Sequence, residues 1–304
     1  MPAVPSGAQF EIRHGKQRAT VVEVGAAIRE YVDNERPVLD PFPSDAMCDG
    51  AHGTPLIPWA NRLADGRYRF DGHEYQVPLT EPEKQNAIHG LARWRNWQPI
   101  RQGPCTVVMG TRLHPSPGYP FTLDLEIDYT LSAAGLTVEI SATNMGTGPC
   151  PYACGQHPYM SPGAGLIDQC TLQLAAETRI LSDPVRQLPT GLEAVAGTAF
   201  DFRTPRPIGE QQVDFAFTDL SRDQDNLAWA RLGCPDGRSV ALWVDATFSV
   251  LELYTGDTLA PHRRRRGLGT EPMTGPPNGL QSGVGLIRLE SGQRHTSRWG
   301  VRLD

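Results

Sequence analysis

Three short polar segments, far apart in the chain, hold the residues best suited to chemistry. They are Asn86–Leu91, Gly155–Tyr159 and Thr270–Asn278. They contain His89, His157 and Glu271, each followed directly by glycine or proline, residues that give the backbone special conformations. Two imidazoles and a carboxylate can move protons at neutral pH, because one kind of group donates while the other accepts. The pattern predicts acid–base catalysis on a neutral substrate.

Other roles for these three residues remain open from their types alone. Glu271 also fits a solvated carboxylate at a turn before proline, since most glutamates face solvent. His157 precedes Pro158, which favours an extended backbone, so its imidazole fits either a site wall or a structural contact. The two histidines could instead ligate a metal ion, but the third conventional ligand is missing from the local spacing. We therefore expect no metal.

Composition limits the class of protein. The chain has 304 residues, of which 39% are hydrophobic and 20% charged, and it carries a net charge of −6. A packed core is expected from this balance, and the acidic charge argues against a nucleic-acid partner. No apolar run is long enough to cross a membrane.

The N-terminus and the cysteines indicate the compartment. The first seven residues lack a charged start followed by an apolar stretch, so they do not predict a secretory signal. The six cysteines lack the paired spacing of a zinc site. We expect free thiols in a reducing cytoplasm.

Alternation of apolar and polar residues recurs along the chain, and helical periodicity is rare. Asp71-Gly72 predicts one hairpin, Ala134-Gly135 a second, and Pro235-Asp236-Gly237 a third. Strands are predicted at 68–70, 73–77, 123–129, 136–142, 239–244, 248–254, 285–289 and 297–303. Many short antiparallel strands with no linker between them predict one large all-β domain, a sandwich or barrel, over residues 1–304.

Five segments, in order, resemble the aldose 1-epimerase (galactose mutarotase-like) family. They are Pro58–Phe70, Asn86–Leu91, Gly155–Tyr159, Leu253–Asp257 and Thr270–Thr274. The resemblance implies an antiparallel β-sandwich of the galactose mutarotase type (a supersandwich), with a sugar-binding cleft on one concave sheet face. It also implies an isomerase that needs no cofactor and interconverts the α and β anomers of a free monosaccharide.

The resemblance implies a role for individual residues. Glu271 matches the general base and His157 the general acid, while His89 matches the histidine that contacts the substrate near its ring oxygen. Arg62, with Asn61 before it, matches the motif that binds sugar hydroxyls. Asp214 matches the substrate-binding aspartate, with Asp219 as a competitor. Tyr159 and Tyr254 could stack on the sugar or pack in the core.

These roles fit the chemistry of ring opening. A free aldose ring opens when its C1 hydroxyl loses a proton and its ring oxygen gains one, and it can then close on the opposite face. A carboxylate and a protonated imidazole would perform both transfers. Neither a metal nor a nicotinamide is required, and the sequence has no Rossmann fingerprint or P-loop.

Three alternative functions remain. The first is an anomerase for a phosphorylated or sulfonated sugar, whose anion the run Arg263–Arg266 could bind; the run also fits a solvated loop. A non-catalytic carbohydrate-binding protein is a second alternative, and a glycoside hydrolase or lyase using Glu271 with Asp214 is a third. The protein is expected to be a monomer or homodimer. The remaining histidines (His14, His52, His73, His114, His262 and His295) are expected at the surface or in loops.

Overall fold

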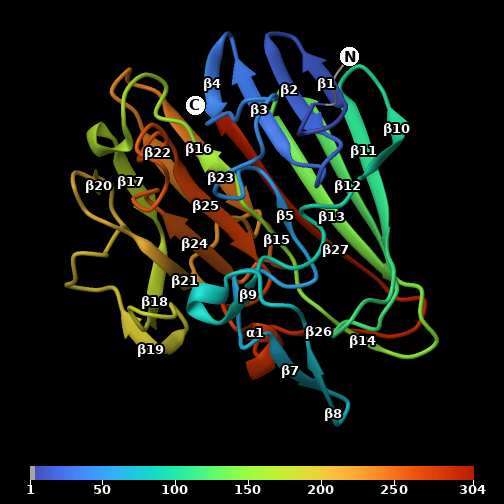
Figure 1. Cartoon of the computed structure of the whole chain (residues 1–304). Helices are drawn as coiled ribbons and strands as arrows, with labels where there is room; N and C mark the ends of the chain where they lie inside the picture. The colour runs from blue at the N-terminus through green and yellow to red at the C-terminus, as the bar shows by residue number, and fades with distance from the viewer. Residues whose placement is uncertain (1–3) are drawn as a thin grey trace.

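The computed structural model describes residues 4–304, which form two large antiparallel sheets that pack against one another (Figure 1). An all-β fold is therefore confirmed. The helical elements within these residues are short: α1 (Gly279–Ser282) and the 3-10 turns η1 (Pro82–Lys84) and η2 (Ile167–Gln169). None of the helices in this range is long and apolar enough to cross a membrane.

The first sheet has 12 strands within the described range. In spatial order they are β1 (Gln9–His14), β2 (Gln17–Val22), β3 (Ile28–Asp33), β4 (Arg36–Leu39), β16 (Tyr159–Met160), β25 (Leu268–Met273), β24 (Val250–Tyr254), β21 (Asp214–Leu220), β18 (Ala176–Ser182) and β19 (Pro189–Ala194), with β15 (Gly155–Gln156) joining β25 to β5 (Pro55–Leu56).

The second sheet has nine strands in the same residues. They are β10 (Gln98–Gln102), β11 (Thr106–Leu113), β12 (Leu123–Ser132), β13 (Gly135–Asn144), β27 (Arg294–Leu303), β23 (Ser239–Val244), β22 (Ala228–Gly233), β17 (Thr171–Leu174) and β20 (Arg206–Pro207). Three small pairs complete the fold: β6 (Arg62–Ala64) with β9 (Asn86–Ile88), β7 (Arg67–Phe70) with β8 (His73–Gln76), and β14 (Cys150–Tyr152) with β26 (Ile287–Leu289).

The sequence patterns explain the long strands of the second sheet. β12 alternates buried and half-buried residues along its whole length, as a strand with one face in the core should. The hairpin to β13 is confirmed, but its turn lies one residue earlier than predicted, at Ala133 and Ala134. Gly135 already pairs with Ser132, and a Cβ on it would lie 2.5 Å from the Val301 carbonyl oxygen. Glycine is needed here because β27 passes so close.

One buried side chain of the second polar segment, Gln156, links the two sheets. The Gln156 amide donates to Gly53 O (3.1 Å) and to the Tyr129 hydroxyl (3.0 Å). Its carbonyl oxygen accepts from the Trp299 indole at 3.0 Å. Tyr129 and Trp299 belong to the nine-stranded sheet, so Gln156 fixes the 12-stranded sheet on it, one residue before His157.

Candidate active site

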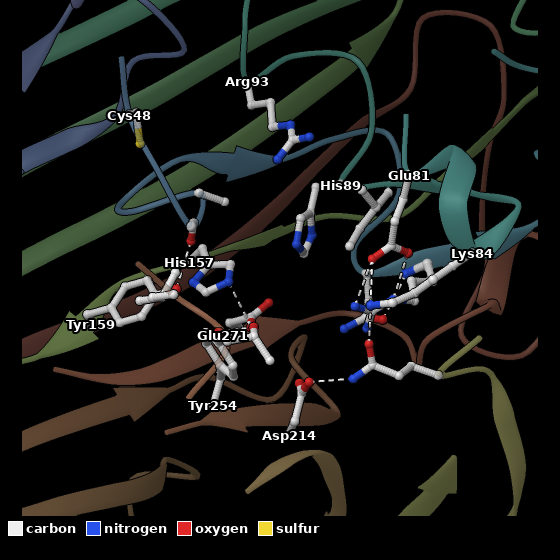
Figure 2. A pocket seen from close by; sticks show the side chains of 18 of the residues that line it. Cys48, Glu81, Lys84, His89, Arg93, His157, Tyr159, Asp214, Tyr254 and Glu271 are labelled. Atoms are coloured by element: carbon white, nitrogen blue, oxygen red, sulfur yellow. Dashed lines mark hydrogen bonds and ion pairs between the residues drawn. The ribbon is translucent and has the colours of Figure 1, made fainter. Parts of the chain in front are cut away.

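A cleft of about 450 Å³ opens over the 12-stranded sheet and collects the predicted residues (Figure 2). Its lining includes Asn61, Arg62, His89, His157, Tyr159, Asp214, Tyr254 and Glu271. These residues come from strands and loops up to 210 positions apart in the chain, from Asn61 to Glu271. The fold therefore gathers the three polar segments at one place.

The centre of the cleft is a contact between Glu271 and His157. Glu271 lies in β25, a strand in the middle of the sheet whose six residues are all buried, so the alternative of a solvated turn is wrong. Its Oε1 lies 3.1 Å from His157 Nε2. The His157 backbone is held on both sides, since its N–H donates to Thr54 O (3.1 Å) and its carbonyl accepts from Gly53 N (2.8 Å).

Burial determines the charge of this pair. It lowers the pKa of His157 to about 3 and raises the pKa of Glu271 well above its ordinary value, because both side chains are shielded from water. The proton is therefore on Glu271 in the empty cleft. Glu271 Oε2 and His157 Nδ1 are buried with no hydrogen-bond partner in residues 4–304. The pair thus holds one transferable proton and retains unused hydrogen-bonding capacity.

His89 completes the group and depends on an unusual backbone. His89 and Gly90 both have positive φ, 62° and 69°. A Cβ on Gly90 would lie 2.0 Å from Ile57 O, so no other residue fits there without a shift. The His89 ring is 5.4 Å from that of His157 at 77°, and burial lowers the pKa of His89 far below its usual range. Both imidazoles are therefore neutral in the empty cleft.

A chain of polar contacts forms one wall of the cleft. Glu81 binds Arg62 through two hydrogen bonds, of 2.9 and 3.1 Å, and binds Lys84 at 3.0 Å. Lys84 donates to Gln187, which in turn donates to Asp214 (Figure 2). Asn61 supports this wall from the side, because its Oδ1 accepts from the Arg62 backbone N–H at 2.8 Å.

The structure separates the two candidate aspartates. Asp214 begins β21 and lines the cleft, whereas Asp219 is exposed and lies outside the cleft lining. A third acid, Glu252 in β24, was not predicted; it is 3% exposed and pairs in register with Glu271. Burial raises the pKa of Glu252 to about 8, with a further contribution from Asp214. The sequence feature that could have identified Glu252 is its charge within the otherwise apolar run Val250–Leu253.

Tyr159 lies in the cleft wall with both ring faces covered. His52 stacks on it at 3.7 Å and 7°, and His157 at 4.9 Å and 13°. The Tyr159 hydroxyl donates to Gly50 O at 2.7 Å. These faces are not open to a sugar, so Tyr159 orients His157 instead. His52 lies in a loop, one of the two places expected for it, but it is buried there and 2% exposed.

The four-arginine run lies in the loop between β24 and β25, outside the cleft lining. Arg263 binds Asp40 at 3.0 Å and also donates to His52. Arg265 binds Asp257 at 2.9 Å and contacts Asp168. Two of the four arginines are thus occupied by carboxylates, and the loop position supports the structural interpretation of the run.

The same three central residues could also hold a metal ion. Ligand atoms of His89, His157 and Glu271 all lie within 4.8 Å of one another. Neutral imidazoles and a carboxylate are ordinary ligands of zinc. They are equally the groups of a proton-transfer site, and the two possibilities differ in their response to a chelator.

Comparison with known proteins identifies the family. The sequence profile described as aldose 1-epimerase matches residues 8–302. The chain is 35% identical to the uncharacterized Escherichia coli protein YihR over 95% of this chain and 91% of YihR. It is 28% identical to the aldose 1-epimerase of Escherichia coli over 72% of this chain and 66% of that enzyme.

Solved structures show the same fold. The GalM/aldose epimerase homologue from C. elegans superposes with a TM-score of 0.86 at 19% identity, covering 98% of both chains. The galactose 1-epimerase of Lactobacillus acidophilus gives a TM-score of 0.77 at 18% identity, over 96% of this chain and 92% of that one. With the profile match across nearly its whole length, the chain belongs to the aldose 1-epimerase family.

Proposed function

We propose that the protein is an aldose 1-epimerase that interconverts the α and β anomers of a free sugar. The observation that carries this proposal is the buried contact of 3.1 Å between His157 Nε2 and Glu271 Oε1. A pure binding protein has no need for a shielded acid–base pair, because ordinary hydrogen bonds to sugar hydroxyls suffice for binding.

Glu271 and His157 together hold one proton, which is what the reaction needs, because one group must accept a proton while the other donates one. In the empty cleft the shared proton is on Glu271, and moving it along the hydrogen bond to His157 gives a carboxylate beside an imidazolium. The carboxylate then takes the proton of the C1 hydroxyl while His157 gives its proton to the ring oxygen, which opens the ring. Rotation about the C1–C2 bond and the reverse transfers close it on the other face.

The remaining cleft residues would position the sugar. His89 would contact the substrate near the ring oxygen, and the wall of Asn61, Arg62 and Asp214 offers both donors and acceptors to hydroxyl groups. Positioned groups of this kind favour the reaction by holding the reacting oxygens within reach of the proton pair.

The test is the optical rotation of freshly dissolved α-D-glucose and α-D-galactose. Wild type should speed equilibration, and Glu271→Gln should be slower by about 10²- to 10⁴-fold because it removes the base. Glu210→Gln is the control, since that carboxylate is exposed. If no free sugar, neutral or anionic, equilibrates faster with wild type, the proposal fails and a binding protein becomes the better interpretation. Release of reducing sugar from a glycoside would instead indicate a hydrolase.

Chelation separates proton transfer from metal catalysis at the same three residues. Dialysis against EDTA should leave the rate unchanged within error, because proton transfer by Glu271 and His157 needs no ion. A rate that falls with EDTA and returns with added zinc would contradict the proposed mechanism and assign His89, His157 and Glu271 as ligands.

A further inference from the structure

Arg93 is a cation of the cleft lining that pairs with no carboxylate among the described residues. It lies in the turn after β9 and is half-buried. Within residues 4–304, its side chain makes neither an ion pair nor a hydrogen bond, and its guanidinium lies over the Trp94 ring, 5.2 Å from the ring centre. Burial lowers the pKa of Arg93 below its ordinary value, yet arginine stays charged in proteins.

The other cations of the cleft differ from Arg93 in this respect. Arg62 and Lys84 both bind Glu81, at 2.9 and 3.0 Å. Cys48, which lines the cleft near Arg93, offers no negative charge, because burial raises the pKa of its thiol to about 12. A partly desolvated guanidinium without an anion is unfavourable in the empty protein, and an anionic ligand would relieve this.

The position of Arg93 would allow it to contact one end of a sugar while C1, at the other end, lies near Glu271. Figure 2 shows Arg93 across the cleft from Glu271 and Asp214, with His89 between them. Trp94, whose ring lies under the guanidinium, also lines the cleft and is 46% exposed. In the described part of the chain, the cleft therefore places the carboxyl groups of Glu271 and Asp214 across from a guanidinium that pairs with neither of them.

We infer that Arg93 binds an oxyanion carried by the sugar away from C1, so that the substrate is an anionic aldose. The inference rests on the proposed function and narrows its substrate class. The shared chemistry is a phosphate, sulfonate or carboxylate on the exocyclic carbon, since the planar guanidinium can donate two parallel hydrogen bonds to any of these groups. The anion site is then at Arg93 inside the cleft and not in the Arg263–Arg266 loop.

The experiment compares glucose with its 6-phosphate, its 6-sulfonate and its 6-carboxylate (glucuronate). Exchange of magnetisation between the two anomeric protons gives the rate at equilibrium, so no pure anomer is required. For wild type, kcat/KM for at least one anionic sugar should exceed that for glucose by about 10- to 100-fold, as expected for charge-assisted hydrogen bonds. The three anionic arms identify which group is preferred.

Variants assign the preference to Arg93. In Arg93→Met the ratio of kcat/KM for the preferred anionic sugar to that for glucose should fall about 10- to 100-fold, chiefly through KM, and Arg93→Lys should keep part of it. Arg264→Ala is the matched control, because this exposed arginine lies outside the cleft. Thermal unfolding of each variant checks that the fold is intact.

The outcomes separate this inference from the proposed function. If glucose equilibrates as fast as every anionic sugar, or if Arg93→Met slows glucose and anionic sugars equally, the anion site is wrong while the epimerase stands. An equal loss would indicate that Arg93 acts on the histidines instead. If no sugar of either class equilibrates faster, the epimerase itself fails.

Discussion

Glu252 shows how burial changes the pKa of a single carboxyl group. It is opposite Glu271 on the neighbouring strand, and its Oε2 has no hydrogen-bond partner in the described part of the chain. Because two adjacent buried carboxylates would repel each other, at least one must be protonated at neutral pH. The pKa of Glu252, raised to about 8, makes it a neutral acid behind the reactive one.

This protonation links stability to pH. In the unfolded chain Glu252 ionises near its ordinary pKa of 4.5, whereas in the folded protein it keeps its proton up to about 8. Unfolding between these values releases a proton, so the stabilisation is complete below pH 4.5 and is lost as pH rises through 8. Urea unfolding from pH 5 to 8 should show the stability of wild type falling relative to Glu252→Gln by about 1.4 kcal/mol per pH unit.

An exposed glutamate provides the control for this pH dependence of stability. Glu210→Gln, which changes an exposed carboxylate, should follow wild type at every pH. Parallel stability curves for wild type and Glu252→Gln would show that Glu252 is ionised in the folded protein.

At the scale of elements, the turn after β9 depends on Gly90. Its positive φ is strained for any other residue, and its Cβ position is blocked by Ile57 O at 2.0 Å. Gly72, in the β7–β8 hairpin, has a φ of 81° but nothing within 4 Å of its Cβ position. The two glycines therefore separate backbone strain from steric overlap.

We expect different results from alanine at these two turns. Gly72→Ala should lower the free energy of unfolding by about 1 kcal/mol, the usual penalty for a left-handed alanine. Gly90→Ala should lower it by about 1–3 kcal/mol more, the usual cost of overpacking, and should also slow catalysis by displacing His89. Urea unfolding and optical rotation measure both effects, and equal losses for the two variants would refute the steric explanation.

Gln156 connects elements of both sheets. Replacing it by methionine keeps the volume but leaves the Trp299 indole N–H without its partner. The Tyr129 hydroxyl and Gly53 O each lose one hydrogen bond and keep another, to Ala26 O and from the Ile28 N–H. Since an unsatisfied buried group costs about 1–3 kcal/mol and a lost hydrogen bond about 1 kcal/mol, we expect a loss of about 3 kcal/mol in urea unfolding. Gln98→Met, on the exposed strand β10, is the control and should change stability by less than about 0.5 kcal/mol. A loss below about 1 kcal/mol for Gln156→Met would contradict the role assigned to it.

For the whole molecule, the bond network of Gln156 implies that site and core unfold together. The residue after it is His157, whose backbone is fixed by Thr54 and Gly53. We expect urea to abolish epimerase activity and to shift tryptophan fluorescence at the same midpoint, because Trp299 reports the sheet interface. Activity lost at clearly lower urea than fluorescence would show that the cleft opens independently.

The sequence predicted the overall architecture better than the details of the cleft. Strands with regular alternation, such as β12, were recognisable because one face is buried and the other wet. β25 was missed because it is buried on both faces and contains Pro272, so Glu271 lacked any strand pattern. Arg93 and His52 carry no motif of their own. Their roles arise from neighbours that the chain brings together only on folding, and local spacing does not encode these.

The stack of His52, Tyr159 and His157 gives the protein an internal spectroscopic label. Protons held above an aromatic face are shielded by its ring current, and the imidazole of His157 lies against Tyr159 at 4.9 Å and nearly parallel. The NMR signals of its carbon-bound protons should therefore be shifted upfield from those of solvent-exposed histidines. The protonation of His157, and the arrival of a sugar beside it, can then be followed without attaching any probe.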